Sequence, residues 1–139
     1  MELSPGERAF VERAAVGRLA TVGDDGTPHV VPICFVLFDS RFYSVVDEKP
    51  KRGTRLQRLR NIESTARAAL VIDHYSDDWS ELAWVMVRGP AAVLKESAEH
   101  RAAIGALREK YPQYHTMALD DRPVIRLTPE RVNSWGLSD

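Results

Sequence analysis

The sequence is poor in cysteine, in net charge and in long apolar runs. Cys34 is its single cysteine, so the chain cannot form an internal disulfide, which fits a reducing cytoplasm. The formal charge is −1, which excludes the global positive field that recruits nucleic acid or anionic membranes. The longest apolar run, 30–38, is interrupted by Pro32 and is too short to cross a bilayer. We therefore expect a cytoplasmic protein with no nucleic-acid or membrane partner.

Familiar catalytic and metal-binding motifs are also missing. The sequence has no nucleophile elbow, P-loop or glycine-rich dinucleotide fingerprint, and its four histidines match no zinc signature. It therefore identifies no catalytic residue and predicts no metal site. Apolar residues make up 44% and charged residues 28% of the chain, as in ordinary globular proteins. We expect a single domain spanning residues 1–139.

Helical signals occur at two places. Ser4, Pro5 and Glu7 form a typical helix start, with a capping serine, a first-turn proline and a glutamate that completes a capping box. This helix should end near Gly17. A second helix is predicted over 98–111, where apolar residues share one face.

The rest of the chain reads mainly as strands. Alternating or β-rich runs predict strands over 18–22, 27–38, 42–46, 68–75, 82–94 and 124–135. The residues 23–26 and Asp39-Ser40 form short turns, so the first three strands should be antiparallel neighbours. Gly89-Pro90 indicates a bulge or bend in a long strand. The fold class is therefore mainly β, a closed or half-closed barrel with a few helices.

The basic segment 49–60 is the strongest chemical signal. It contains six cations and no acid: Lys49, Lys51, Arg52, Arg55, Arg58 and Arg60. Such charges repel one another mildly when they share a helix, and an anionic ligand reverses this repulsion. A phosphate site is the favoured reading, with a solvated basic face as the alternative. Nucleic-acid binding is disfavoured because the segment has little aromatic interleaving.

The order of several motifs resembles the pyridoxamine-phosphate-oxidase-like flavin-binding split barrels. Within them, it is most similar to an actinobacterial branch of coenzyme F420-dependent enzymes. The segments that carry the resemblance are 17–22 (GRLATV), 28–33 (PHVVPI), 42–51 (FYSVVDEKPK), 58–62 (RLRNI), 73–75 with 78–79 (DHY and DW) and 87–91 (VRGPA).

The resemblance implies a six-stranded antiparallel FMN-binding split barrel that forms a homodimer, with cofactor sites between the subunits. It implies that the ring system lies against the strand of residues 30–34. The third strand and the basic segment should hold the phosphate-bearing side chain. The resemblance also implies that Asn61 caps or positions the basic helix and that Trp79 covers the ring edge, from the same or the partner subunit. The cofactor-binding residues carried over are Val30, Pro32, Ile33, Cys34, Ser44, Val45, Val46, Lys49, Lys51, Arg55, Arg58, Asn61 and Trp79.

The choice of cofactor follows from the number of cations. FMN carries one phosphate, whereas F420 carries a phosphodiester and several carboxylates, which six cations suit better. The resemblance also implies F420, with FMN as the alternative. The expected function is an F420-dependent oxidoreductase that transfers a hydride to a small conjugated organic acceptor. Two alternatives stay open: a protein that stores or senses the cofactor without turnover, and an FMN-dependent oxidase of the pyridoxamine-phosphate type.

Overall fold

The computed structural model describes residues 2–47 and 55–137, and it begins with helix α1 (Pro5–Arg13). The predicted capping box is present. The Ser4 side chain accepts a hydrogen bond from the Glu7 amide at 3.1 Å, and the Glu7 carboxylate accepts one from the Ser4 amide at 2.9 Å. Two amides that the first turn would leave unsatisfied are thereby bonded. The helix ends at Arg13, earlier than the predicted end near Gly17, because Ala14 adopts an extended conformation.

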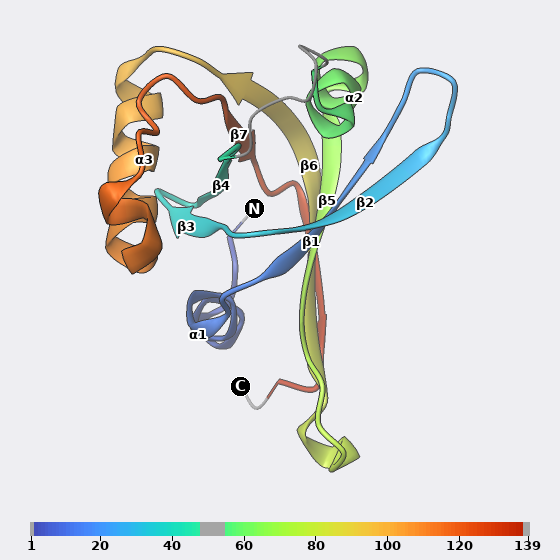
Figure 1. Cartoon of the computed structure of the whole chain (residues 1–139). Helices are drawn as coiled ribbons and strands as arrows, with labels where there is room; N and C mark the ends of the chain where they lie inside the picture. Colours follow the sequence, from blue (N-terminus) through green and yellow to red (C-terminus); the bar gives the residue numbers. More distant parts are fainter. Residues whose placement is uncertain (1, 48–54, 138–139) are drawn as a thin grey trace.

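In the described part of the chain, eight strands pair into one antiparallel sheet (Figure 1). Their order is β2-β1-β5-β6-β7-β4-β3, and β8 pairs with β6. The strands are β1 (Gly17–Val22), β2 (Pro28–Ile33), β3 (Val36–Phe38), β4 (Arg41–Val45), β5 (Arg67–His74), β6 (Ala83–Leu94), β7 (Val124–Leu127) and β8 (Arg131–Trp135). The remaining elements are α2 (Gln57–Thr65), η2 (Trp79–Glu81), α3 (Ala98–Lys110) and η3 (Pro112–Thr116). None of the helices in these ranges is long and apolar enough to span a membrane.

Two of the six predicted strands are interrupted, which explains the larger number. The strand expected over 27–38 breaks between β2 and β3, where the Phe35 amide donates to the Tyr111 hydroxyl instead of to a neighbouring strand. The strand expected over 124–135 breaks between β7 and β8, at a segment that contains Pro129. Proline has no amide hydrogen for the ladder. Both segments turn corners of the barrel.

Gly89 and Pro90 lie at a third corner. The register of β6 with β5 continues without an extra residue through both positions, so the predicted bend is present and no bulge accompanies it. At this point β6 changes its other partner, from β8 to β7. The backbone of the β7–β8 connection crosses here, with the Thr128 amide donating to Pro90 and the Glu130 amide to Arg88, both at 2.9 Å. Only glycine leaves room for this crossing.

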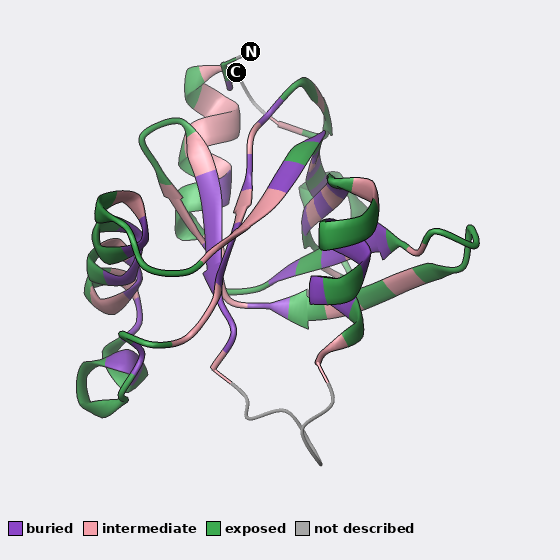
Figure 2. Cartoon of the chain, turned by 90° about the horizontal axis from the view of Figure 1, so that it is seen from above, coloured by how far each residue is buried: buried purple, intermediate pink, exposed green. Residues whose placement is uncertain are grey.

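Two groups of buried side chains stabilise the fold. The larger lies inside the barrel and includes Leu19, Phe35 and Ile72. The smaller lies between the sheet and α3 and includes Leu107 of α3 and Tyr43 of β4. Figure 1 shows α3 covering the β3 and β4 end of the sheet, and Figure 2 shows buried residues concentrated along the strands. The consequence for β4 is that both of its faces are buried.

Replacing Gly89 by alanine should lower the free energy of unfolding by about 1–3 kcal/mol, because a Cβ atom there meets the Thr128 carbonyl oxygen and the Glu130 backbone. Urea denaturation measures the change. Gly105→Ala is the matched control, since a Cβ at that position in α3 meets nothing within 4 Å. It should raise stability by roughly 0.5–1 kcal/mol through helix propensity. Equal effects of the two substitutions would contradict the close approach of the β7–β8 connection to Gly89.

Candidate functional site

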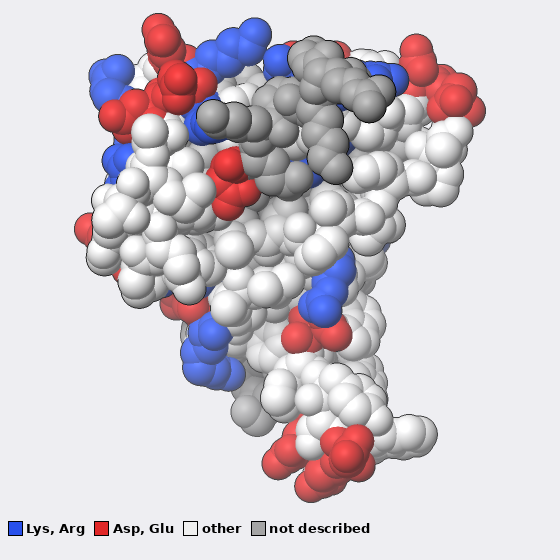
Figure 3. All heavy atoms as spheres, in the orientation of Figure 1, with Lys and Arg blue, Asp and Glu red and all other residues white. Residues whose placement is uncertain are grey.

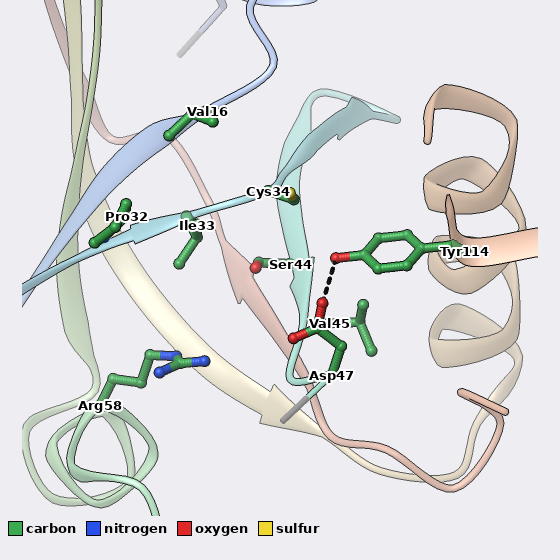
Figure 4. Close-up of a pocket in the computed structure, with 9 residues that line it drawn as sticks. All are labelled: Val16, Pro32, Ile33, Cys34, Ser44, Val45, Asp47, Arg58 and Tyr114. Atoms are coloured by element: carbon green, nitrogen blue, oxygen red, sulfur yellow. Dashed lines mark hydrogen bonds between the residues drawn. The ribbon is translucent and has the colours of Figure 1, made fainter. Parts of the chain in front are cut away.

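A pocket of about 270 Å³ opens where β2, β4 and α2 meet (Figure 4). Its lining comes from five separate parts of the chain. The residues are Val16, Pro32, Ile33, Cys34, Ser44, Val45, Asp47, Arg58 and Tyr114. The volume is slightly below the usual range for small-molecule sites, which is about 300–1,000 Å³. One side of the pocket is apolar, and polar groups approach from the others.

The apolar side is the end of β2 and the corner that follows it. This corner is held by Tyr111 at the end of α3. The Phe35 amide donates to the Tyr111 hydroxyl at 2.9 Å, and that hydroxyl reaches the carbonyls of Ala15 at 2.8 Å and Phe35 at 2.9 Å. Burial raises the pKa of Tyr111 to about 12, so the phenol keeps its hydrogen at physiological pH. One side chain thus ties the corner beside Cys34 to the start of β1.

Lys110 strengthens the same corner. Its Nζ donates to the Phe35 carbonyl at 2.9 Å and lies 3.9 Å from the centre of the Phe35 ring. Burial lowers the pKa of Lys110 to about 8. The side chain thus contributes a hydrogen bond and a cation–π contact to the wall of the pocket.

Ser44 lies on β4 and is buried at the centre of the pocket (Figure 4). The preceding residue, Tyr43, points to the opposite face of β4 and connects this strand to α3. Its hydroxyl donates to Glu99 at 2.7 Å, and Glu99 also pairs with Arg126 at 2.9 Å. Successive side chains of a strand point to opposite faces of the sheet. Because the Tyr43 side chain packs on α3, the Ser44 side chain points into the pocket.

Arg58 supplies positive charge to the pocket from α2. The residue is only 7% exposed, which is rare for an arginine. Its guanidinium points toward the pocket from the α2 side, whereas Asp47 and Tyr114 lie on the α3 side (Figure 4). The pocket therefore has a cationic end and an acidic end, with the apolar corner between them.

The acidic end is a hydrogen-bonded pair. The Tyr114 hydroxyl donates to the Asp47 carboxylate at 3.0 Å. Burial raises the pKa of Tyr114 above its ordinary value, and the negative charge of Asp47 raises it further. The phenol is therefore neutral and acts as the donor in this pair.

The structure brings six of the predicted cofactor residues around this pocket: Pro32, Ile33, Cys34, Ser44, Val45 and Arg58. Lys49 and Lys51 lie outside the described residues. Arg55 is held away by Glu63, through two hydrogen bonds of 2.8 Å each. The helix that follows begins at Gln57.

The other predicted residues have different surroundings. Val46 is buried in the barrel core, and Val30 is 63% exposed on β2. Asn61 is buried on α2, where it donates to Thr21 at 3.0 Å and accepts from Gln57 at 2.7 Å. These bonds are consistent with its predicted role of positioning α2.

Trp79 lies in η2, at the tip of the β5–β6 hairpin and far from α2 (Figure 1). It is 71% exposed. Acidic side chains gather at this tip (Figure 3), because the connection carries Asp77, Asp78 and Glu81. Within one subunit, Trp79 does not reach the pocket, so its predicted contact with the cofactor requires a second copy of the chain.

The sequence interpretation did not select Val16, Asp47 or Tyr114. Asp47 belongs to the FYSVVDEKPK motif, from which Ser44, Val45, Val46 and the two lysines were predicted to bind the cofactor. Asp47 was not among them, because an acidic side chain does not match an anionic ligand. Tyr114 had no usable signal: it follows the second helix, and 67 residues separate it from Asp47. Only the packing of η3 against the end of β4 brings them together.

Comparison with known proteins supplies the family. The sequence profile described as pyridoxamine 5'-phosphate oxidase matches residues 3–136. The chain belongs to this family. A relative, 5a,11a-dehydrotetracycline/5a,11a-dehydrooxytetracycline reductase from Streptomyces rimosus, is 28% identical over 138 residues, covering 99% of this chain and 85% of the reductase. Membership of the pyridoxamine 5'-phosphate oxidase family and this relative support a general oxidoreductase role with a flavin-like cofactor.

Solved structures confirm the predicted split barrel. The conserved hypothetical protein Rv2991 from Mycobacterium tuberculosis has a TM-score of 0.77 at 23% identity, covering 96% of this chain and 84% of that one. HutZ, the heme storage protein from Vibrio cholerae, has a TM-score of 0.73 at 18% identity, covering 99% of this chain and 96% of HutZ. Such identities show a shared fold alone. All four histidines of this chain are described, and none lines the pocket.

Tyr111→Phe should lower the free energy of unfolding by about 1–3 kcal/mol, because it leaves the buried Phe35 amide without its acceptor. Chemical denaturation monitored by tryptophan fluorescence measures this loss. Tyr75→Phe removes the same hydroxyl from a side chain that is 67% exposed, and it should change stability by less than about 0.5 kcal/mol. A Tyr111→Phe variant as stable as the Tyr75→Phe variant would show that the corner does not depend on this bond.

Proposed function

We propose that the protein is an F420-dependent oxidoreductase that transfers a hydride between the reduced deazaflavin and a small conjugated organic acceptor. The observation that carries this proposal is the pocket itself: a buried arginine faces the apolar end of β2 across Ser44. The relationship to a reductase supports the same reaction class. The family resemblance directs the choice of the deazaflavin.

The described residues fit a flat, anionic cofactor. Pro32, Ile33 and Val45 present apolar surface for a ring system, and the Arg58 guanidinium suits a phosphate by charge-assisted hydrogen bonds. A bound deazaflavin would supply a hydride to the acceptor, and a proton from bulk solvent would complete the reduction. The residues of the pocket bind and orient the ring and exclude water from it, which is the part that a protein contributes to cofactor chemistry.

The preference for F420 over FMN rests on the remaining cations. Glu63 neutralises Arg55, which removes one cation from the predicted set. Arg58 and Arg60 on α2, with Lys49, Lys51 and Arg52 of the same segment, still exceed what one phosphate needs. A polyanionic tail matches this number better.

A homodimer with cofactor sites between the subunits is part of the proposal. The pocket is smaller than a flavin-type cofactor with its tail requires, so a second subunit would complete it. Exposed aromatic side chains also support a partner surface. Trp84 of β6 and Trp135 of β8 lie opposite each other in the sheet, with exposures of 36% and 54%. A second copy would bury this apolar surface.

Titration under anaerobic conditions tests the cofactor and the reaction together. We expect binding of F420 at about micromolar concentration or below, clearly weaker binding of FMN, and loss of affinity as salt rises, because part of the tail contact is exposed. Addition of enones, quinones and imines to the loaded, reduced protein should then reoxidise the cofactor. Binding without turnover across the panel would favour a storage or sensor protein. Turnover with FMN and oxygen alone would favour an oxidase.

Two arginines of α2 provide the control for this titration. Arg58→Ala should weaken cofactor binding by about 10- to 150-fold, the loss expected for a hydrogen bond to a charged group. Arg60→Ala changes an exposed arginine on the same helix, outside the pocket, and should cost severalfold at most. Equal losses would mean that α2 acts as a diffuse positive surface.

Light scattering tests the assembly. The loaded protein should have the mass of a dimer at micromolar concentration, and Trp135→Glu should shift it toward the monomer by placing a charge on the proposed interface. A wild-type monomer that still holds the cofactor would contradict the shared site.

A further inference from the structure

The acidic end of the pocket has no role in hydride transfer as proposed above. Asp47 and Tyr114 lie across the pocket from Arg58, and they face the same cavity as Ser44 and the corner of β2 (Figure 4). A carboxylate beside a site for an anionic cofactor weakens binding unless it contacts a hydrogen-bond donor. Tyr114 already donates to one oxygen of Asp47, so a hydrogen-bond donor on the ligand is favoured at the acceptor positions that the pair leaves open.

We propose that the Asp47–Tyr114 pair accepts a hydrogen bond from the imide N–H of the cofactor ring and so determines which edge of the ring enters the pocket. The inference rests on the proposed function. It names the ligand group that these two residues recognise, and it applies to a deazaflavin and to a flavin alike, since both rings carry this N–H.

The first support is the direction of the hydrogen bond inside the pair. The single hydrogen of the Tyr114 hydroxyl is directed to Asp47 Oδ2 at 3.0 Å. The phenol oxygen then has only lone pairs to offer, and an ionised carboxylate is an acceptor by nature. The pair as a whole thus presents acceptors to the cavity. A ring edge with only carbonyl oxygens would be repelled there.

The second support is the fixed position of Tyr114. The residue is 4% exposed, and its ring packs against that of Tyr111, with 5.5 Å between the ring centres. Arg108 of α3 donates to the carbonyls of Tyr114 at 3.3 Å and of Met117 at 2.9 Å, which braces η3. A donor group on the ligand therefore meets an acceptor that is already in place, so binding costs little side-chain conformational entropy.

The third support is the separation of charge across the pocket. Arg58 favours an anion at the α2 side, and Asp47 disfavours one at the α3 side. A cofactor with an anionic side chain and a ring edge that donates satisfies both ends in one orientation only. The reverse orientation places negative charge against the carboxylate.

The test compares each cofactor with its N3-methyl derivative, which lacks only the imide hydrogen. F420, FMN and their N3-methyl forms are titrated into the full-length protein by fluorescence. Wild type should bind the parent compounds at least about tenfold more tightly than the methylated ones. In the double variant Asp47→Leu/Tyr114→Phe, which removes both acceptors, this ratio should fall to about that caused by the bulk of the methyl group alone.

Arg58→Ala is the matched control. It should weaken binding of every compound, while the ratio of parent to methylated cofactor stays at the wild-type value. Equal binding of parent and methylated cofactor by wild type would overturn the inference and leave the proposed function intact. Binding of neither parent cofactor would overturn the proposed function and the inference together. The wild-type comparison needs no variant, so it stands even if the double variant folds poorly.

Discussion

The bond between the Phe35 amide and the Tyr111 hydroxyl is the constraint on which the rest of the structure depends. It ends β2, starts the corner toward β3, and joins α3 to the barrel. The same hydroxyl reaches the carbonyl of Ala15 just before β1. A buried amide without this acceptor would cost stability, so the corner and the end of α3 must form together. The apolar wall of the pocket is a direct product of this single arrangement.

Around that corner, the fold places opposite charges on opposite sides of one cavity. α2 contributes Arg58 of the basic segment, and the residues just after β4 contribute Asp47, which hydrogen-bonds to Tyr114 of η3. Neither charge is on the open surface, where water and salt would screen it. The pocket can therefore distinguish the two ends of an asymmetric ligand. This property is the common basis of the proposed cofactor binding and of the proposed recognition of the ring edge.

Relatives with the same split barrel include a reductase and a heme storage protein, so the fold leaves the activity open. The site carries the distinction. In the described residues, the pocket offers an arginine, a serine and an aspartate–tyrosine pair, and no histidine lines it. This chemistry suits an anionic ring cofactor. The exposed Trp84 and Trp135 lie on another part of the sheet, where the proposed second subunit would cover them.

The sequence by itself determined the local features and the family. The capping box of α1, the turn at Asp39-Ser40 and most strand positions follow from short-range preferences that a few neighbouring residues satisfy. The basic segment and the ordered motifs were sufficient to select Arg58 and the residues at the end of β2. These signals are readable because they lie in short stretches of sequence.

Only the tertiary structure decided which residues form the site. Tyr111 meets Phe35 across 76 residues, and Tyr114 meets Asp47 across 67. The tertiary structure also pairs Arg55 with Glu63, away from the pocket, and places Trp79 at the distant tip of the β5–β6 hairpin. The break between β2 and β3 has the same origin, because Tyr111 accepts the hydrogen bond of the Phe35 amide in place of a neighbouring strand. Such contacts depend on how the chain closes on itself, and no local pattern records them.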